Sequence, residues 1–223
     1  MKGERHALRI RTFFHFRVYH VKMRASYDFY ALELLMLEVQ GLQFDYGDKP
    51  LLQDVSFTLA AGSALHIKGA NGAGKTTLLK LLAGLLHPTE GKILHQHQLA
   101  YVGHKPGVNM HLTPREHARL DLSSKLSDAL IIQSLRRLNL FDLQHTPCGL
   151  LSAGQCRRVG LLQLINADAL LWLLDEPWVA LDQESINILG DILFAHVSVG
   201  RSVIFTSHQV LPFTFPILQE LVI

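Results

Sequence analysis

Residues 69–76 read Gly-Ala-Asn-Gly-Ala-Gly-Lys-Thr, which matches the pattern G-x-x-x-x-G-K-T. The preceding residues 64–68 are largely apolar and favour a strand, whereas residues 77–84 favour a helix that ends at a glycine. Glycines let such a loop turn so tightly that its N–H groups can point at phosphates, and the helix start adds a positive dipole end. This order of strand, loop and helix predicts an α/β fold of the P-loop type.

Two side chains at the end of the loop add to what the backbone offers. Lys75 is predicted to reach the β- and γ-phosphates of a nucleotide, and the hydroxyl of Thr76 is predicted to bind Mg²⁺. A chance glycine turn before a core helix is the alternative, and the context on both sides of the loop argues against it.

Composition and charge limit the classes of protein to which the chain can belong. The chain has 223 residues, enough for one large domain with a buried core, and its net charge of +2 argues against a dedicated nucleic-acid binder. Its two cysteines, Cys148 and Cys156, provide no disulfide framework and no four-ligand zinc site. No apolar run approaches the ~18 residues that a transmembrane helix needs, so any membrane attachment is expected to come through a partner.

The first 35 residues differ from the rest. Residues 1–24 hold seven basic residues against one acidic residue, with aromatic residues between them. Such a stretch could touch anionic lipid or nucleic acid, but we favour a start codon assigned too far upstream, with residues 1–35 disordered or absent from the native protein. The pattern of a folded domain begins at Met36, so the predicted nucleotide-binding domain spans residues 36–223, with a helical subdomain at about 104–165.

The remaining elements follow from periodicity and turn signals. Residues 37–46 and 54–60 favour strands around a turn at 47–50, and residues 93–94 and 99–102 favour short strands. A more polar helical pattern covers 113–143, with Thr113 as its N-cap. Continuous apolar runs at 170–174 and 202–206 are typical of buried parallel strands.

The run at 170–174 ends in two carboxylates, Asp175 and Glu176. A carboxylate at the end of a strand beside a phosphate loop is placed to hold Mg²⁺, directly or through water, and we assign this role to Asp175. Glu176 is then predicted to polarise the attacking water as a general base. An acidic strand end before the turn at Pro177 is the alternative.

Residues 151–155 read Leu-Ser-Ala-Gly-Gln and open a helix with Ser152 as a natural N-cap. They resemble the L-S-G-G-Q signature of ATP-binding cassette (ABC) ATPases, with Ala153 in place of a glycine. The resemblance implies a P-loop NTPase with a RecA-like core, an antiparallel β-subdomain and a compact helical subdomain. It also implies ATP as the nucleotide and a second copy of the chain, because in that family each signature closes over the γ-phosphate held by the other copy.

Further residues match the same family. Tyr46 stands where an aromatic residue stacks on adenine, although a core aromatic at a strand edge remains an alternative. Asp182 matches the residue at the dimer seam, and His208 matches the switch histidine that contacts the γ-phosphate. His104 replaces the usual glutamine near Mg²⁺, where contact through water suits an ion that prefers oxygen ligands. The predicted nucleotide-binding residues are Tyr46, Gly69, Asn71, Gly72, Ala73, Gly74, Lys75, Thr76, Thr77, Ser152, Gly154, Gln155 and Asp182; the metal residues are Thr76, Asp175 and His104; the catalytic residues are Glu176 and His208.

Within these ATPases, residues 101–107 and 171–177 resemble the cytochrome c maturation protein A family, and the likeness covers about 36–223. It implies a peripheral ATPase on the cytoplasmic face of the bacterial inner membrane, bound to small integral membrane subunits. That system releases haem-loaded chaperone for cytochrome c biogenesis. The alternatives are the ATPase of another small-molecule exporter, a soluble cassette ATPase acting on DNA or ribosomes, and a module that binds ATP without hydrolysis.

Overall fold

The computed structural model of the chain describes residues 11–12, 35–47, 49–95, 97–105, 107–120, 126–179, 181–208 and 213–223. The interpretation of residues 1–35 as disordered or as a mis-assigned start therefore lies almost wholly outside the described residues. Within the described residues, no helix combines the length and the apolar character needed to cross a bilayer.

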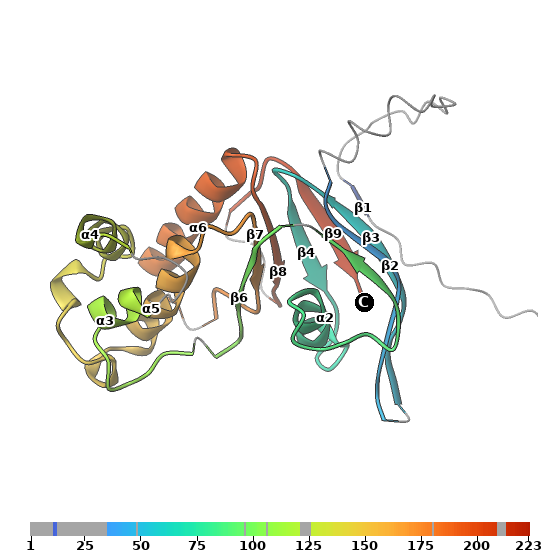
Figure 1. The fold of residues 1–223 in the computed structure, drawn as a ribbon, viewed down its shortest axis with the longest axis horizontal. Coiled ribbons are helices and arrows are strands. Elements are labelled where there is room, and N and C mark those ends of the chain that lie inside the picture. Colours follow the sequence, from blue (N-terminus) through green and yellow to red (C-terminus); the bar gives the residue numbers. More distant parts are fainter. Residues whose placement is uncertain are drawn as a thin grey trace, which may run out of the picture.

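Six strands of the described chain form the central sheet, in the order β1-β9-β4-β8-β7-β6 (Figure 1). All neighbouring pairs from β9 to β6 are parallel, and only β1 runs antiparallel to its neighbour β9. Because parallel strands end at the same edge, the segments that follow β4, β6, β7 and β8 meet there. The strands are β1 (Arg11–Thr12), β4 (Ala64–Lys68), β6 (Leu99–Val102), β7 (Leu171–Leu174), β8 (Ser202–Thr206) and β9 (Leu218–Val222).

A second sheet is antiparallel, in the order β3-β2-β5. Its strands are β2 (Leu35–Tyr46), β3 (Lys49–Ala60) and β5 (Glu90–Leu94). The sequence placed the start of β3 at residue 54, but the strand begins at Lys49, because its pairing with β2 continues to the tight turn at Gly47, whose φ is 63°. This sheet is the antiparallel β-subdomain that the family resemblance implies.

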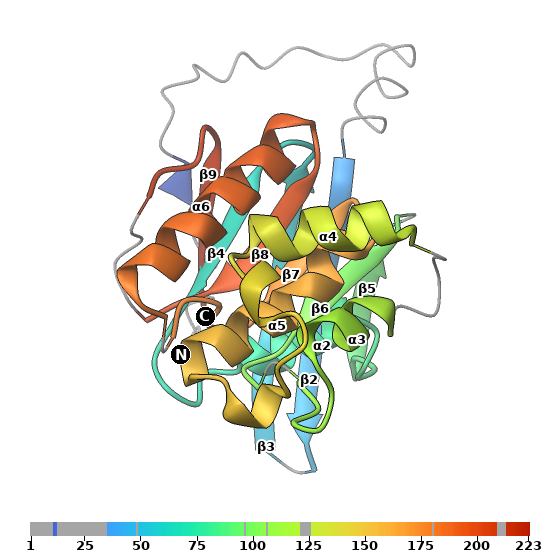
Figure 2. The same cartoon turned by 90° about the vertical axis from the view of Figure 1, so that its left-hand side faces the viewer.

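Helices cover the parallel sheet and extend from it. Figure 1 shows α3, α4 and α5 grouped at the end of the molecule away from the antiparallel sheet, and Figure 2 shows the same three helices from that end. The predicted N-cap at Thr113 is confirmed, since its side chain accepts a hydrogen bond from the N–H of Glu116. The helices are α2 (Lys75–Leu82), α3 (Pro114–Arg119), α4 (Asp128–Arg137), α5 (Ala153–Asn166) and α6 (Gln183–Ser198), with 3₁₀ turns at Phe141–Leu143 and Cys148–Leu150.

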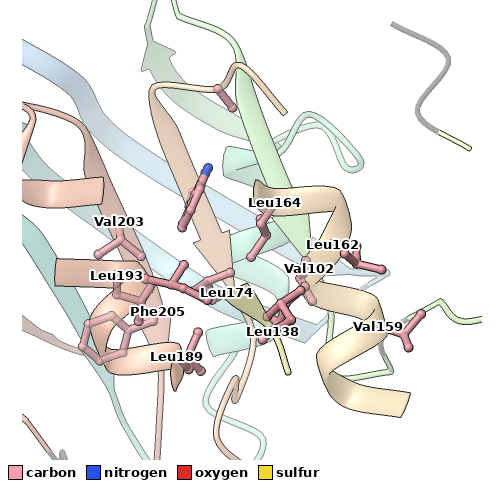
Figure 3. Close-up of a cluster of buried hydrophobic side chains, with 14 of the residues drawn as sticks. Val102, Leu138, Val159, Leu162, Leu164, Leu174, Leu189, Leu193, Val203 and Phe205 are labelled. Atoms are coloured by element: carbon pink, nitrogen blue, oxygen red, sulfur yellow. The ribbon is translucent and has the colours of Figure 1, made fainter. Parts of the chain in front are cut away.

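Strand β7 separates two hydrophobic clusters. Successive side chains of a strand point to opposite faces, so Leu171 and Leu173 pack toward α2 and the antiparallel sheet, whereas Trp172 and Leu174 pack toward α5 and α6. Figure 3 shows the second of these clusters, to which α6 contributes Leu193. Burial on both faces explains why the sequence of β7 is continuously apolar rather than alternating.

Leu193→Ala is expected to destabilise the fold by about 2 to 5 kcal/mol, because Leu193 is 0% exposed and its truncation leaves a cavity between α6 and the sheet. Leu85→Ala is the matched control, since Leu85 is 60% exposed and should change stability by roughly 0.5 kcal/mol or less. Urea unfolding of both variants measures the difference. Equal losses in the two variants would contradict the assignment of Leu193 to the core.

Candidate active site

The loop between β4 and α2 has the backbone geometry that a phosphate cradle requires. Gly72 and Gly74 have φ angles of 81° and 102°, a region that residues with a side chain rarely adopt. A Cβ atom at Gly74 would also lie 2.8 Å from Leu52 Cδ2. Gly74 is the N-cap of α2, so the unpaired N–H groups of the first helical turn open beside the loop.

Lys75 is buried at the start of α2, with 7% of its surface exposed. Its Nζ donates to the backbone carbonyls of Gly69, at 3.0 Å, and Ala70, at 2.9 Å. These two bonds hold the ammonium group against the loop backbone. A positive charge beside unpaired N–H groups suits a phosphate ligand.

Asp175 follows β7, and its side chain contacts Thr76, the second residue of α2. The hydroxyl of Thr76 donates to Asp175 Oδ2 at 2.8 Å, and the hydroxyl of Thr206, at the end of β8, donates to Oδ1 at 2.8 Å. Asp175 is only 2% exposed, so these two hydroxyls fix the orientation of its carboxylate. One hydroxyl and one carboxylate in contact fit Mg²⁺, which prefers oxygen ligands and usually completes its shell with water and phosphate. Among the described residues there is no group of three or more His, Cys, Asp or Glu side chains that could form a protein-only metal site.

Glu176 faces His208 across the end of the sheet. Glu176 Oε1 lies 3.3 Å from His208 Nε2, and the backbone N–H of His208 donates to Oε2 at 3.3 Å. The Glu176 backbone has a φ of 50°, which is uncommon for a residue with a side chain, and its N–H donates to Thr206 Oγ1 at 2.9 Å. This backbone turn directs the carboxylate of Glu176, a residue that is 8% exposed, toward the residue predicted to be the switch histidine.

One cavity, of about 610 Å³, brings most of the predicted residues together, and its volume suits a nucleotide-sized ligand. Tyr46 forms one wall, 57% exposed, with its ring edge-on to Phe44. The exposed side chain of His104 forms another part of the lining. The lining residues are Tyr46, Leu51, Asn71, Gly72, Gly74, Lys75, Thr76, Thr77, His104, Asp175, Glu176, Val179 and His208.

A second cavity, of about 630 Å³, adjoins the first at His208. It is lined by Gly69 and by residues of β4, β9 and the segment before β9, and His208 is the lining residue that the two cavities share. None of the predicted metal or carboxylate residues lies in it, so the smaller cavity is the candidate active site. Ala73 does not line either of these two cavities.

The signature residues lie apart from this cavity. Ser152 caps α5 in a reciprocal pair with Gln155: the Gln155 N–H donates to Ser152 Oγ at 3.2 Å, and the Ser152 N–H donates to Gln155 Oε1 at 2.9 Å. Asp182 likewise caps α6 by accepting from the N–H of Ser185 at 2.9 Å. The described residues that line the chain's own cavity do not include Ser152, Gly154, Gln155 or Asp182.

Sequence reasoning missed two residues that shape the site. Thr206 bonds both the carboxylate of Asp175 and the backbone N–H of Glu176. Arg157, in α5, donates to the backbone carbonyls of both acidic residues. A polar residue at the end of an apolar strand, and an arginine on the buried face of a helix, were the only signals available in the sequence.

Comparison with known proteins agrees with the geometry. The family model described as ABC transporter matches residues 52–179. The "Cytochrome c biogenesis ATP-binding export protein CcmA" of Legionella pneumophila is 49% identical over 189 residues, which cover 79% of this chain and 94% of that protein. The protein of the same name from Gluconobacter oxydans is 40% identical over 177 residues, covering 79% of this chain and 83% of that protein.

A solved structure described as an ATP-binding subunit of an ABC transporter has a TM-score of 0.70 and 27% identity. The likeness covers 78% of this chain and 79% of that one. These matches confirm the predicted α/β fold of the P-loop NTPase type. The chain therefore belongs to the ABC transporter family as one of its ATP-binding members.

Proposed function

We propose that this chain hydrolyses MgATP in a dimer of two copies and thereby drives an export complex that serves cytochrome c biogenesis. The observation that carries the proposal is the joint arrangement of Lys75, Asp175 and Glu176 around one cavity, in a chain 49% identical to a cytochrome c biogenesis export protein. In this assignment Glu176 accepts a proton from the attacking water. The backbone N–H of His208 donates to this carboxylate at 3.3 Å, and we assign His208 the role of holding it in place.

Mg²⁺ would be held by Thr76 and Asp175. Their side chains are already 2.8 Å apart, and Thr206 fixes the second carboxylate oxygen of Asp175. Bound there, the ion would neutralise charge on the β- and γ-phosphates. His104 lines the same cavity and offers a ring nitrogen, a poorer Mg²⁺ ligand than oxygen, so we assign it a contact through water.

The dimer is proposed because the chain holds two separate anion-binding features. The loop before α2 lines the cavity. The start of α5 is not among the described residues that line it, and Ser152 is exposed there. A capped helix start has N–H groups suited to a phosphate. A second copy would bring Ser152, Gly154 and Gln155 to the γ-phosphate and Asp182 to the seam between the copies.

The export role comes from the relatives. We propose small integral membrane subunits as partners, peripheral attachment at the cytoplasmic face of the inner membrane, and haem-loaded chaperone as what the complex releases. The absence of a bilayer-crossing helix among the described residues is compatible with attachment through a partner. Neighbouring genes for such subunits would support the assignment.

The test is complementation of a Legionella pneumophila strain that lacks its CcmA gene. Wild-type chain is expected to restore c-type cytochromes, detected by haem staining, and to sediment with membranes, whereas the Lys75→Ala variant should restore none. Re-supplying the deleted gene is the positive control. A chain that is expressed and hydrolyses ATP but restores no cytochrome would indicate another exporter, and one that sediments with ribosomes would indicate a soluble cassette ATPase.

A further inference from the structure

Arg157 is a buried arginine at which three segments of the chain meet. It lies in α5 and is 6% exposed. One terminal nitrogen of its guanidinium, Nη2, donates to the backbone carbonyls of Glu176, at 2.6 Å, and Asp175, at 3.3 Å. The other, Nη1, donates to the backbone carbonyl of His104, in the loop after β6.

The surroundings explain why an arginine stands here. Burial lowers the pKa of the Arg157 guanidinium, and the nearby carboxylates of Asp175 and Glu176 act in the opposite direction. A planar guanidinium has donors fixed in a fork, so one side chain can reach carbonyls from separate segments at once. The ammonium of a lysine is a single point charge with rotatable donors and lacks this fixed fork.

The bond to Glu176 bears on the orientation of the proposed base. The positive φ of Glu176 is a conformation that residues with a side chain leave readily unless their surroundings hold them. Its N–H is held by Thr206 Oγ1 at 2.9 Å and its C=O by Arg157 at 2.6 Å. Arg157 therefore fixes one of the two ends of the peptide turn that aims the Glu176 carboxylate at His208.

The same arginine stands one turn along the helix from the signature. Ser152 caps α5 and Arg157 is the fifth residue of that helix, so a shift of the helix start moves the guanidinium with it. The loop that carries His104 is tied to the same group, and the side chain of His104 lines the nucleotide cavity. A displacement at either place reaches the Glu176 backbone through one side chain.

We propose that Arg157 is a positioning residue that couples closure of the α5 start on a second copy's nucleotide to the orientation of Glu176 in the chain's own site. This inference rests on the proposed ATP-sandwich dimer. It predicts that the geometry of the guanidinium, and not only its charge, sets the rate of hydrolysis.

The experiment compares the wild-type chain with Arg157→Gln and Arg157→Lys in steady-state ATP hydrolysis, with folding followed by circular dichroism. Both variants are expected to lose on the order of 10²-fold in kcat, because the base is misplaced, while KM for ATP changes by about threefold or less. Cooperativity between the two sites should fall, with the Hill coefficient moving toward one. Gln163→Ala is the control, since Gln163 is exposed on the same helix.

Three results would overturn the inference. They are a kcat within about twofold of wild type in Arg157→Gln, full activity in Arg157→Lys, and a rise in KM that accounts for the whole loss. Arg157→Lys keeps the buried positive charge. If Arg157→Gln does not fold, the rate of hydrolysis in Arg157→Lys alone tests the inference. A wild-type chain that hydrolyses no ATP, either alone or in membranes that contain its partner subunits, would instead refute the proposed function, so the two failures are distinguishable.

Discussion

Glu176→Gln is expected to bind ATP and to hydrolyse it roughly 10²- to 10⁴-fold more slowly than the wild-type chain, which is the range that a general base contributes. The amide keeps the size of the side chain and its place beside His208, 3.3 Å away, but cannot accept the proton of the attacking water. ATP should therefore remain bound and hold two copies together. Steady-state phosphate release measures the first effect, and light scattering after gel filtration with MgATP measures the second.

The control for this variant is Asp191→Asn, which neutralises an exposed carboxylate on α6 without touching the cavity. It should hydrolyse ATP as the wild-type chain does. Hydrolysis at the wild-type rate in Glu176→Gln would remove Glu176 from the role of base. A variant that is inactive but does not dimerise with ATP would agree with Glu176 as the general base and would contradict the proposed ATP-bound dimer.

Lys75→Ala is expected to weaken ATP binding by roughly 30- to 1,000-fold, which corresponds to about 2 to 4 kcal/mol for a charge-assisted hydrogen bond removed from a buried phosphate site. Lys75 is 7% exposed and its Nζ already lies against the loop carbonyls. Isothermal titration with MgATP measures the change. The fold should persist, because an alanine at the first position of α2 is compatible with a helix.

Lys80→Ala tests whether the effect of Lys75→Ala is specific to the loop. Lys80 lies in the last turn of the same helix and does not line the cavity. Its loss should leave the affinity for ATP within about threefold of the wild-type value. Unchanged ATP binding in Lys75→Ala would contradict the assignment of residues 69–76 to the phosphates.

The parts of the site that the sequence predicted are those encoded locally. The loop before α2, the apolar run that becomes β7 and the cap at Ser152 each follow from neighbouring residues, because turn chemistry and capping act within a few positions. The position of Asp175 beside Thr76 could be expected too, since both follow parallel strands or their loops at one edge of the sheet.

The parts that sequence reasoning missed depend on contacts between distant segments. The acceptors of Arg157 are carbonyls 53, 18 and 19 residues away, and no side-chain pattern marks a backbone carbonyl. Strand β9, with the polar Gln219 and Glu220, has a weak pattern of its own and forms because the edge of β4 offers it backbone partners. Helix α6 is likewise not among the elements predicted from the sequence, although Asp182 is its N-cap, because the family resemblance assigns Asp182 only to the dimer seam.

Because β7 is packed against side chains on both of its faces, this strand limits which substitutions the protein can accept. A volume change at Leu173 or Leu174 would press on one of two packed clusters and displace the carboxylate that follows, so this strand has little room to accept substitutions. Adaptation to another temperature or another membrane partner would therefore fall on outlying positions such as Leu150, 78% exposed just before the signature. Substitutions are therefore expected to be rare in β7 and more frequent at exposed positions of the surface.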